Sequence, residues 1–293
     1  MPLTALALVL LAALLHAGWN LAAKKAAGDH HFIFLAVCLI ALLWSPVLVG
    51  FGPTELPRWT ARDWAVVAAS GFIHVLYFSA LLKGYRVADL TVVYPVARGS
   101  GPLLSALGAA LFLDESLGPL SLLGIACMVV GILLITGLPF LRPGSAAPTD
   151  PQRLRAGLLW GALTGVTIAA YTVVDGWAVR VALLSPIVYD YFANVLRLPF
   201  LLPWVWRDRA RARAAWKANW KPALVLAVCS PAAYMLVLTA MTLAPVSHVA
   251  PAREVSMLFA AMLGGRLLAE ENTRLRVLGA GAMALGVTLL TVA

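Results

Sequence analysis

The feature that most constrains this chain is a series of ten apolar stretches, each about as long as a membrane-spanning helix. Such a helix needs about 20 mostly apolar residues. Stretches of this kind lie at residues 3–23, 32–52, 64–82, 89–112, 119–138, 155–178, 186–206, 222–242, 246–266 and 275–292. Of all residues, 62% are hydrophobic and 12% are charged, whereas a soluble domain carries about 25% charged residues. The sequence therefore predicts an all-α integral membrane protein with ten transmembrane helices, and it excludes a large water-soluble enzyme.

The basic residues predict how these helices are oriented. The net charge is +9, and 16 of the 22 Lys and Arg residues lie in or at the borders of the loops after helices 1, 3, 5, 7 and 9. Only 3 lie in the loops after helices 2, 4, 6 and 8. Basic loops stay in the cytoplasm, so we expect a bacterial-type inner membrane protein with both termini in the periplasm.

Two further patterns are explained by the membrane. The most basic segment, Arg207–Lys221, also carries Trp216 and Trp220, and we interpret it as an anchor at the cytoplasmic lipid surface. We predict no nucleic-acid partner. The cysteines lie singly in apolar stretches and predict no disulfide, metal site or cofactor: Cys38, Cys127 and Cys229.

The two halves of the chain share a closing pattern, a glutamate followed by glycines nine and sixteen residues later. Its members are Glu115, Gly124, Gly131 and Glu270, Gly279, Gly286. We interpret the glycines as sites of close helix packing. The pattern predicts two repeats, residues 1–138 and 155–293, joined by a cytoplasmic linker at residues 139–154. Because each repeat has five spans, an odd number, the second must enter the membrane upside down, as in many secondary transporters.

Ten helices in this arrangement, with the motif Glu-x8-Gly-x6-Gly closing each half, resemble the drug/metabolite transporter superfamily, EamA type. Within it, the chain looks most like the YddG-type exporters of aromatic amino acids. The resemblance implies helices around a central cavity, alternating access and no ATP-binding part. It also raises His74 and Tyr77 as substrate-binding candidates.

Two arginines are placed near mid-bilayer, where a charge is costly and usually faces a cavity or a partner. Arg98 and Arg253 follow Pro95 and Pro251, where a helix can break and expose backbone groups. One interpretation is that they hold a substrate carboxylate, which suits the guanidinium fork. The other is a structural ion pair with Glu254. Arg98 is the better binding candidate, since no acid lies beside it in the sequence.

Aromatic residues inside the spans suit a cavity that stacks an aromatic solute, although lipid-facing packing explains them equally well. They are Trp19, Tyr77, Tyr94, Trp160, Tyr171 and Tyr234, with His74 beside them. The carboxylates of Glu254 and Asp175 are candidates for proton exchange. Asp190, Asn194 and Arg197 share one helix face, and we expect a self-satisfied clamp more than a pathway lining.

These observations favour a secondary transporter that exports amino acids, aromatic or neutral, or related small metabolites. Its partners would be the substrate and the lipid bilayer, and we expect a monomer. A lipid-modifying membrane enzyme is the first rival, but the sequence has no GxSxG, HExxH or GxxxxGK[ST] motif. The second rival is a passive facilitator or channel, whose substrate flux would not respond to opposing gradients of substrate and protons.

Overall fold

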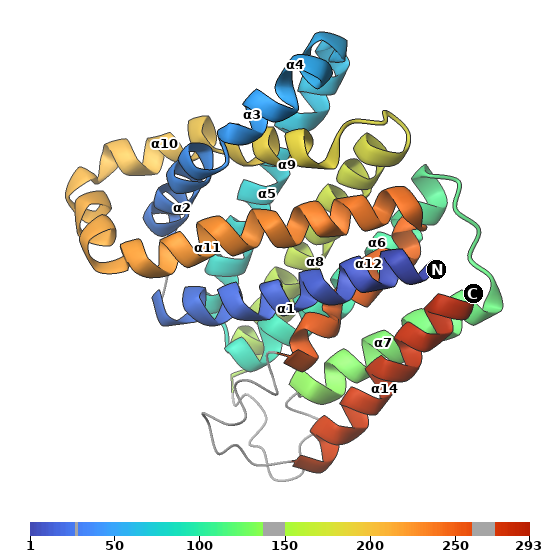
Figure 1. Cartoon of the computed structure of the whole chain (residues 1–293). Coiled ribbons are helices and arrows are strands. Elements are labelled where there is room, and N and C mark those ends of the chain that lie inside the picture. Colours follow the sequence, from blue (N-terminus) through green and yellow to red (C-terminus); the bar gives the residue numbers. More distant parts are fainter. Residues whose placement is uncertain (27–28, 137–149, 260–272) are drawn as a thin grey trace.

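The computed structural model describes residues 1–26, 29–136, 150–259 and 273–293, and within these residues the chain forms helices and no strand (Figure 1). The first half contains α1 Leu3–Ala26, α2 His30–Leu43, α3 Pro46–Gly50, α4 Gly52–Glu55, the 3₁₀ turn η1 Leu56–Arg58, α5 Ala61–Val87, α6 Leu90–Phe112 and α7 Pro119–Thr136. The second half contains α8 Pro151–Arg180, α9 Pro186–Val195, α10 Leu198–Arg207, α11 Arg209–Leu243, α12 Val246–Ala252, the 3₁₀ turn η3 Arg253–Val255 and α14 Thr273–Val292.

Four described stretches are long and apolar enough to cross a membrane: His30–Gly50, α5, α8 and α11. Three shorter apolar stretches lie at Leu3–Trp19, Pro119–Ile135 and Val277–Val292. The number of ten membrane crossings therefore stays a prediction. Part of the ninth predicted span, at residues 260–266, lies outside the described residues, as does most of the predicted linker.

Some predicted spans differ from the helices that form. The span at 186–206 is two helices, α9 and α10, separated by a turn at Leu196 and Arg197. The basic segment, which we expected to be a loop, begins with Arg207 at the end of α10 and otherwise forms the first turns of α11. Asp208 caps it by accepting a hydrogen bond from the Arg211 backbone N–H at 2.8 Å. Arg, Lys and Ala favour helix, so polarity alone did not make this segment a loop.

The predicted break at Pro95 is not formed, because α6 is one continuous helix through Pro95 and Pro102. A proline removes one backbone hydrogen bond and can be tolerated when neighbouring helices support the backbone. In the second half, by contrast, the helix changes from α12 to 3₁₀ geometry directly after Pro251 and Ala252.

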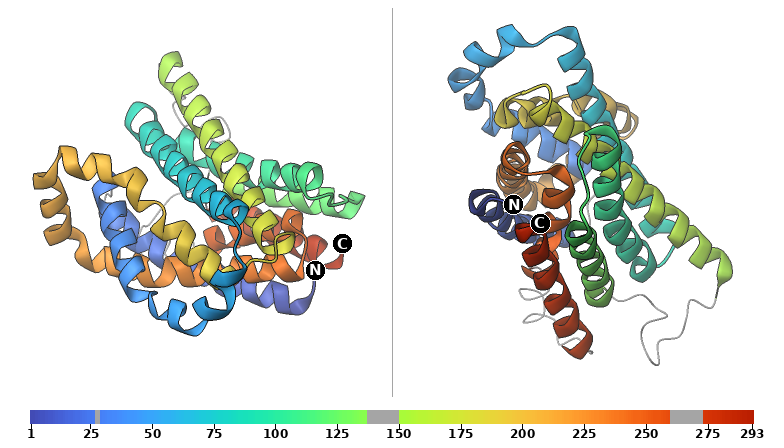
Figure 2. Two further views of the ribbon diagram at one scale, coloured as in Figure 1. Left: turned by 90° about the horizontal axis from the view of Figure 1, so that it is seen from above. Right: turned by 90° about the vertical axis from the view of Figure 1, so that its right-hand side faces the viewer.

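The α7 and α14 helices, which carry the repeated glycines, pack against each other along one edge of the molecule (Figures 1 and 2). A Cβ atom added to Gly131 would lie 2.7 Å from the Gly279 carbonyl oxygen, and one added to Gly286 would lie 2.8 Å from that of Gly124. Only glycine permits this approach. Since Gly124 faces Gly286 and Gly131 faces Gly279, these two related helices run antiparallel, as an inverted repeat requires.

A second glycine pattern, absent from our sequence analysis, joins the repeats at α8 and α6. Gly157, Gly161 and Gly165 recur every four residues on α8 and face α6 at Val92, Val96 and Ser100. Small residues at this spacing let two helix backbones approach closely. On its other side, α8 packs along α5, and α1 packs along α11. The core thus lies between helices of different repeats.

Candidate functional site

Aromatic rings from both repeats meet where α5, α8 and α11 pack together. His74 on α5 stacks on Tyr171 of α8, with ring centroids 4.0 Å apart. Tyr77 approaches Tyr171 edge-on at 5.8 Å, and Tyr234 of α11 does so at 6.3 Å. Four of the predicted aromatic candidates therefore form one cluster, which we call the ring cluster.

Three charged side chains form a second cluster between α6 and η3. The Arg98 Nη1 atom lies 3.2 Å from Glu254 Oε2, and Arg253 Nε lies 3.6 Å from Glu254 Oε1. No acid lies beside Arg98 in the sequence, but Glu254 reaches it from the other repeat, so the ion pair that was our second interpretation is formed. The Arg98 side chain is 21% exposed, whereas Glu254 is 2% exposed.

This charged cluster carries one excess positive charge, because two guanidinium groups share a single carboxylate. Burying an unpaired charge is costly, so a cluster with a surplus cation favours an incoming anion. Arg98 also lies over the Tyr94 ring, with its Cζ atom 5.6 Å from the ring centroid. Arg253 is close enough to Tyr171 and Tyr234 to interact with them electrostatically. The charged cluster thus lies within electrostatic range of the ring cluster.

Asp175 on α8 lies beside these clusters and is 0% exposed. Its Oδ1 atom accepts hydrogen bonds from Ser70 Oγ at 2.5 Å and from Tyr189 Oη at 2.7 Å. Its Oδ2 atom accepts one from Tyr234 Oη at 2.5 Å. We call this arrangement the hydroxyl cradle. Among the described residues, no Lys, Arg or His nitrogen lies within 4.0 Å of the Asp175 carboxylate.

Other predicted candidates lie apart from the ring cluster. Trp19 donates from Nε1 to His16 Nδ1 at 2.9 Å and packs beside the apolar cluster formed by α2 and α11. Trp160 lies against Gly84 of α5, where an added Cβ atom would be 3.1 Å from the Trp160 Cβ atom.

The clamp expected in the seventh predicted span, which forms α9 and α10, is not formed as an ion pair. Asn194 donates to the backbone carbonyl of Asp190 at 2.8 Å, and no ion pair joins Asp190 to Arg197 among the described residues. Asp190 Oδ2 and Arg197 Nε are buried without a hydrogen-bond partner there. The turn between α9 and α10 separates the two charges, although their sequence spacing would place them on one face of a continuous helix.

Sequence reasoning missed the cradle donors Ser70 and Tyr189, since a serine or tyrosine in an apolar stretch gives no signal of its partner. The repeated pattern that begins at Glu115 also gave no sign of its partners in the second repeat. Glu115 accepts hydrogen bonds from the backbone N–H groups of Val246 and Ser247 at 2.7 and 2.8 Å. Arg180 Nη1 pairs with it at 2.9 Å. Glu115 of the first repeat therefore caps α12 of the second.

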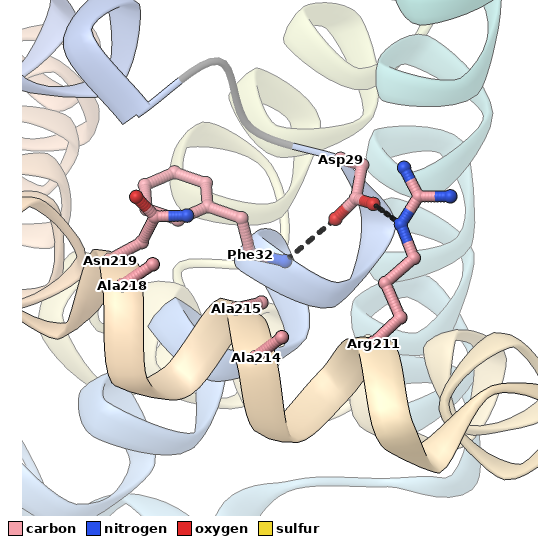
Figure 3. Close-up of a pocket in the computed structure, with 7 residues that line it drawn as sticks. All are labelled: Asp29, Phe32, Arg211, Ala214, Ala215, Ala218 and Asn219. Carbon is pink, nitrogen blue, oxygen red and sulfur yellow. Dashed lines mark hydrogen bonds and ion pairs between the residues drawn. The ribbon is translucent and has the colours of Figure 1, made fainter.

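A pocket of about 280 Å³ lies between the start of α2 and the basic end of α11 (Figure 3). Asp29 caps α2, accepting from the His31 and Phe32 backbone N–H groups at 3.0 and 3.2 Å. It also pairs with Arg211 Nε at 2.9 Å. The other side chains that line the pocket include small or apolar ones, those of Phe32, Ala214, Ala215 and Ala218. We interpret this region as a structural contact that holds α2 to α11.

No group of three or more His, Cys, Asp or Glu residues is placed to hold a metal ion in the parts of the chain that the structure describes. The charged cluster and the cradle instead offer guanidinium and hydroxyl groups. Guanidinium groups bind carboxylates through charge-assisted hydrogen bonds. Hydroxyl groups can donate or accept a hydrogen bond.

Comparison with known proteins identifies the family. The sequence pattern of the EamA-like transporter family matches twice, at residues 3–137 and 155–292. A solved structure described as "Crystal structure of protein" has a TM-score of 0.74 and 17% sequence identity, and the alignment covers 100% of this chain and 98% of that chain. At this identity the likeness concerns the fold alone. No curated protein matches the chain. With both repeats matched over nearly their whole length, the chain belongs to the EamA-like transporter family.

Proposed function

We propose that this protein is a secondary transporter that exports amino acids, aromatic or neutral, or related small metabolites, by alternating access. The observation that carries the proposal is the proximity of the two clusters, since Arg253 interacts electrostatically with Tyr171 and Tyr234. A surplus cation lies near a group of stacked rings, and both clusters draw residues from both repeats. A site at the interface of inverted repeats can be exposed to each side in turn when one repeat rocks against the other.

The proposed division of labour follows the chemistry of each cluster. Arg98, supported by Arg253, binds the substrate carboxylate through its guanidinium fork. The ring cluster, with Tyr94 beside it, contacts the substrate side chain through aromatic faces. Trp19 and Trp160 lie outside this arrangement and would meet substrate only elsewhere on its path.

The remaining proposals concern gating, proton exchange and the location of the protein. Pro95 and Pro251 are the proposed points at which helices adjust during gating, and Glu254 and Asp175 are the two candidates for proton exchange. The protein is proposed to act as a monomer in a bacterial-type inner membrane, with both termini in the periplasm. The aromatic preference extends the resemblance to the YddG-type exporters.

The test uses purified protein in liposomes and three labelled solutes: phenylalanine, alanine and phenethylamine, which lacks the carboxylate. Arg98→Lys keeps the charge and loses the fork, so KM for both amino acids should rise about tenfold, roughly the worth of one charge-assisted hydrogen bond. Phenethylamine flux should not respond to this change. Arg58→Lys, at an exposed arginine of η1, is the matched control.

Tyr77→Ala should change the preference among side chains, with phenylalanine losing more flux than alanine. Equal losses for both solutes would contradict the role given to the rings. Unchanged amino-acid transport in Arg98→Lys would remove the carboxylate site. A flux that ignores opposing substrate gradients would instead favour the passive facilitator.

A further inference from the structure

The carboxylates of the two clusters have different partners: Asp175 of the hydroxyl cradle contacts hydroxyl groups, whereas Glu254 of the charged cluster contacts guanidinium groups. Glu254 faces a guanidinium group on each of its oxygens, at 3.2 and 3.6 Å. Protonating Glu254 would leave the buried Arg253 and the partly buried Arg98 without their counter-charge, which is unfavourable. Asp175 has hydroxyl partners only, so no ion pair is broken when it binds a proton.

The other groups around Asp175 define its setting. His74 of α5 donates from Nδ1 to the Ser70 carbonyl at 2.9 Å, which links the ring cluster to the cradle. Arg197 and Asp190 act on the cradle through space, from the α9–α10 turn and from α9. The α12 helix presents an apolar side chain, Val246, to α8 beside Asp175, at Gly176. Among the described residues, the titratable and charged groups around Asp175 therefore include His74, Tyr189, Asp190, Arg197 and Tyr234.

A proton on Asp175 would change the packing between the repeats. In the ionised form all the hydroxyl partners donate to the carboxylate. Once one oxygen carries a proton it becomes a donor, so a hydroxyl that donated to it must rotate to accept instead. The remaining hydrogen bonds lose the carboxylate charge that strengthened them. Ser70 is the only cradle partner on a first-repeat helix, so its hydrogen bond to Asp175 joins α5 to α8 across the repeats. The adjacent Gly71 lies close to α9, since a Cβ atom added there would be 3.0 Å from the Ala193 carbonyl oxygen.

Burial of the cradle also fits a coupling role. A group that couples two fluxes must not be open to both aqueous phases at once, since an open group would leak protons. Asp175 is 0% exposed and Ser70 is 0% exposed, so the carboxylate is closed to solvent in this conformation. The Asp175 carboxylate can become accessible to one aqueous phase or the other only when the surrounding helices move.

We propose that Asp175 is the proton-binding group of the transport cycle, and that proton binding loosens the contact between α5 and α8 across the repeats. A proton enters from the periplasmic side, binds one Asp175 carboxylate oxygen and leaves to the cytoplasm as substrate is exported. This inference rests on the proposed function, because it requires a transported substrate. It assigns Glu254 to charge compensation in the substrate site.

The test measures substrate efflux from liposomes with an acid exterior and with equal pH, at zero membrane potential set by valinomycin and potassium. The readout is the ratio of the two rates, so a variant that is merely slower is not scored as uncoupled. Asp175→Asn should abolish the gradient response and bring this ratio to about one, because the linkage between proton and substrate is lost. Asp175→Glu should restore part of the response.

Asp114→Asn is the control, since Asp114 is an exposed acid just after α6 and lies outside the cradle. This variant should keep the parental ratio. If Asp175→Asn keeps the gradient response, the assignment to Asp175 is overturned.

Tyr189→Phe provides a variant that keeps the acid and removes one cradle donor. Losing a hydrogen bond to the ionised form should move the midpoint of the pH response upward by about one pH unit. An unchanged midpoint would overturn the inference. A parent protein that exchanges amino acids and ignores the pH gradient would also overturn it while leaving the proposed function intact. Absence of exchange in the parent would overturn the proposed function itself.

Discussion

A single carboxylate, that of Asp29, joins the start of α2 to the basic end of α11 (Figure 3). Partial burial acts to raise the pKa of Asp29, but hydrogen bonds from His31 and Phe32 and the charge of Arg211 outweigh it, so the pKa lies below its usual value of 3.8. A carboxylate whose pKa is lowered on folding adds stability above its unfolded pKa. That contribution is lost as the pH falls through the folded value.

Asp29→Asn should therefore make the protein less sensitive to acid. Asparagine caps a helix about as well as aspartate, so the variant keeps the cap and loses only the charge. Thermal unfolding in detergent should show the parent losing more stability than the variant as the pH falls below about 4. Asp29→Ala, which also removes the cap, should cost about 1 kcal/mol more at neutral pH. Parallel pH profiles for parent and Asp29→Asn would contradict this account.

At the scale of elements, α12 shows how a short helix is held by a partner from the other repeat. Its seven residues are too few to form a stable helix alone. The carboxylate of Glu115 accepts hydrogen bonds from the first backbone N–H groups of α12. Arg180 pairs with Glu115 and also donates from Nη1 to the Ala244 carbonyl oxygen at 2.8 Å. Ser121 Oγ and His248 Nε2 lie 3.0 Å apart and tie α7 to the same helix.

Glu115→Gln should lower the free energy of unfolding by about 1–3 kcal/mol, because the amide offers one acceptor oxygen and no charge. The measurement is denaturant or thermal unfolding in detergent. The matched control is Asp114→Asn, which removes a charge from the exposed neighbouring residue. Asp114 has a φ of 52°, a conformation that asparagine also adopts readily, so its stability should not change. Equal losses in both variants would show that charge alone matters.

At the scale of the whole molecule, the antiparallel packing of α7 and α14 relates the two repeats. The chain termini lie together at one end (Figure 1), where the Met1 ammonium group donates to the Thr291 carbonyl at 2.6 Å. We therefore predict that both ends of the chain face the same side of a membrane.

The distribution of basic residues predicts that this side is the periplasm. An alkaline phosphatase fused after Ala293 should be active, and a fluorescent protein fused there should be dark. Fusions that end at residue 146, inside the predicted cytoplasmic linker, should give the opposite pattern. A cytoplasmic readout at Ala293 would mean that loop charge does not orient this chain.

The sequence by itself determined features that depend on local composition and on periodicity. The apolar stretches predicted helices that fit a membrane, and the repeated glycines predicted close packing, which α7 and α14 show at Gly131 and Gly279. Local turns were less predictable. Pro95 and Pro251 carry similar signals, yet only the second precedes a change of helix type, because support from neighbouring helices decides whether a lost hydrogen bond matters.

Only the tertiary structure decided which buried charges are compensated and by what. Arg98 and Glu254 are separated by 156 residues, and Ser70 and Asp175 by 105. These pairings depend on which faces of α5, α6, α8 and η3 meet, which is set by the summed packing of many side chains. No single residue carries that information, so the sequence identified Asp175 without revealing its partners, and it offered the pairing of Arg98 with Glu254 only as one of two interpretations.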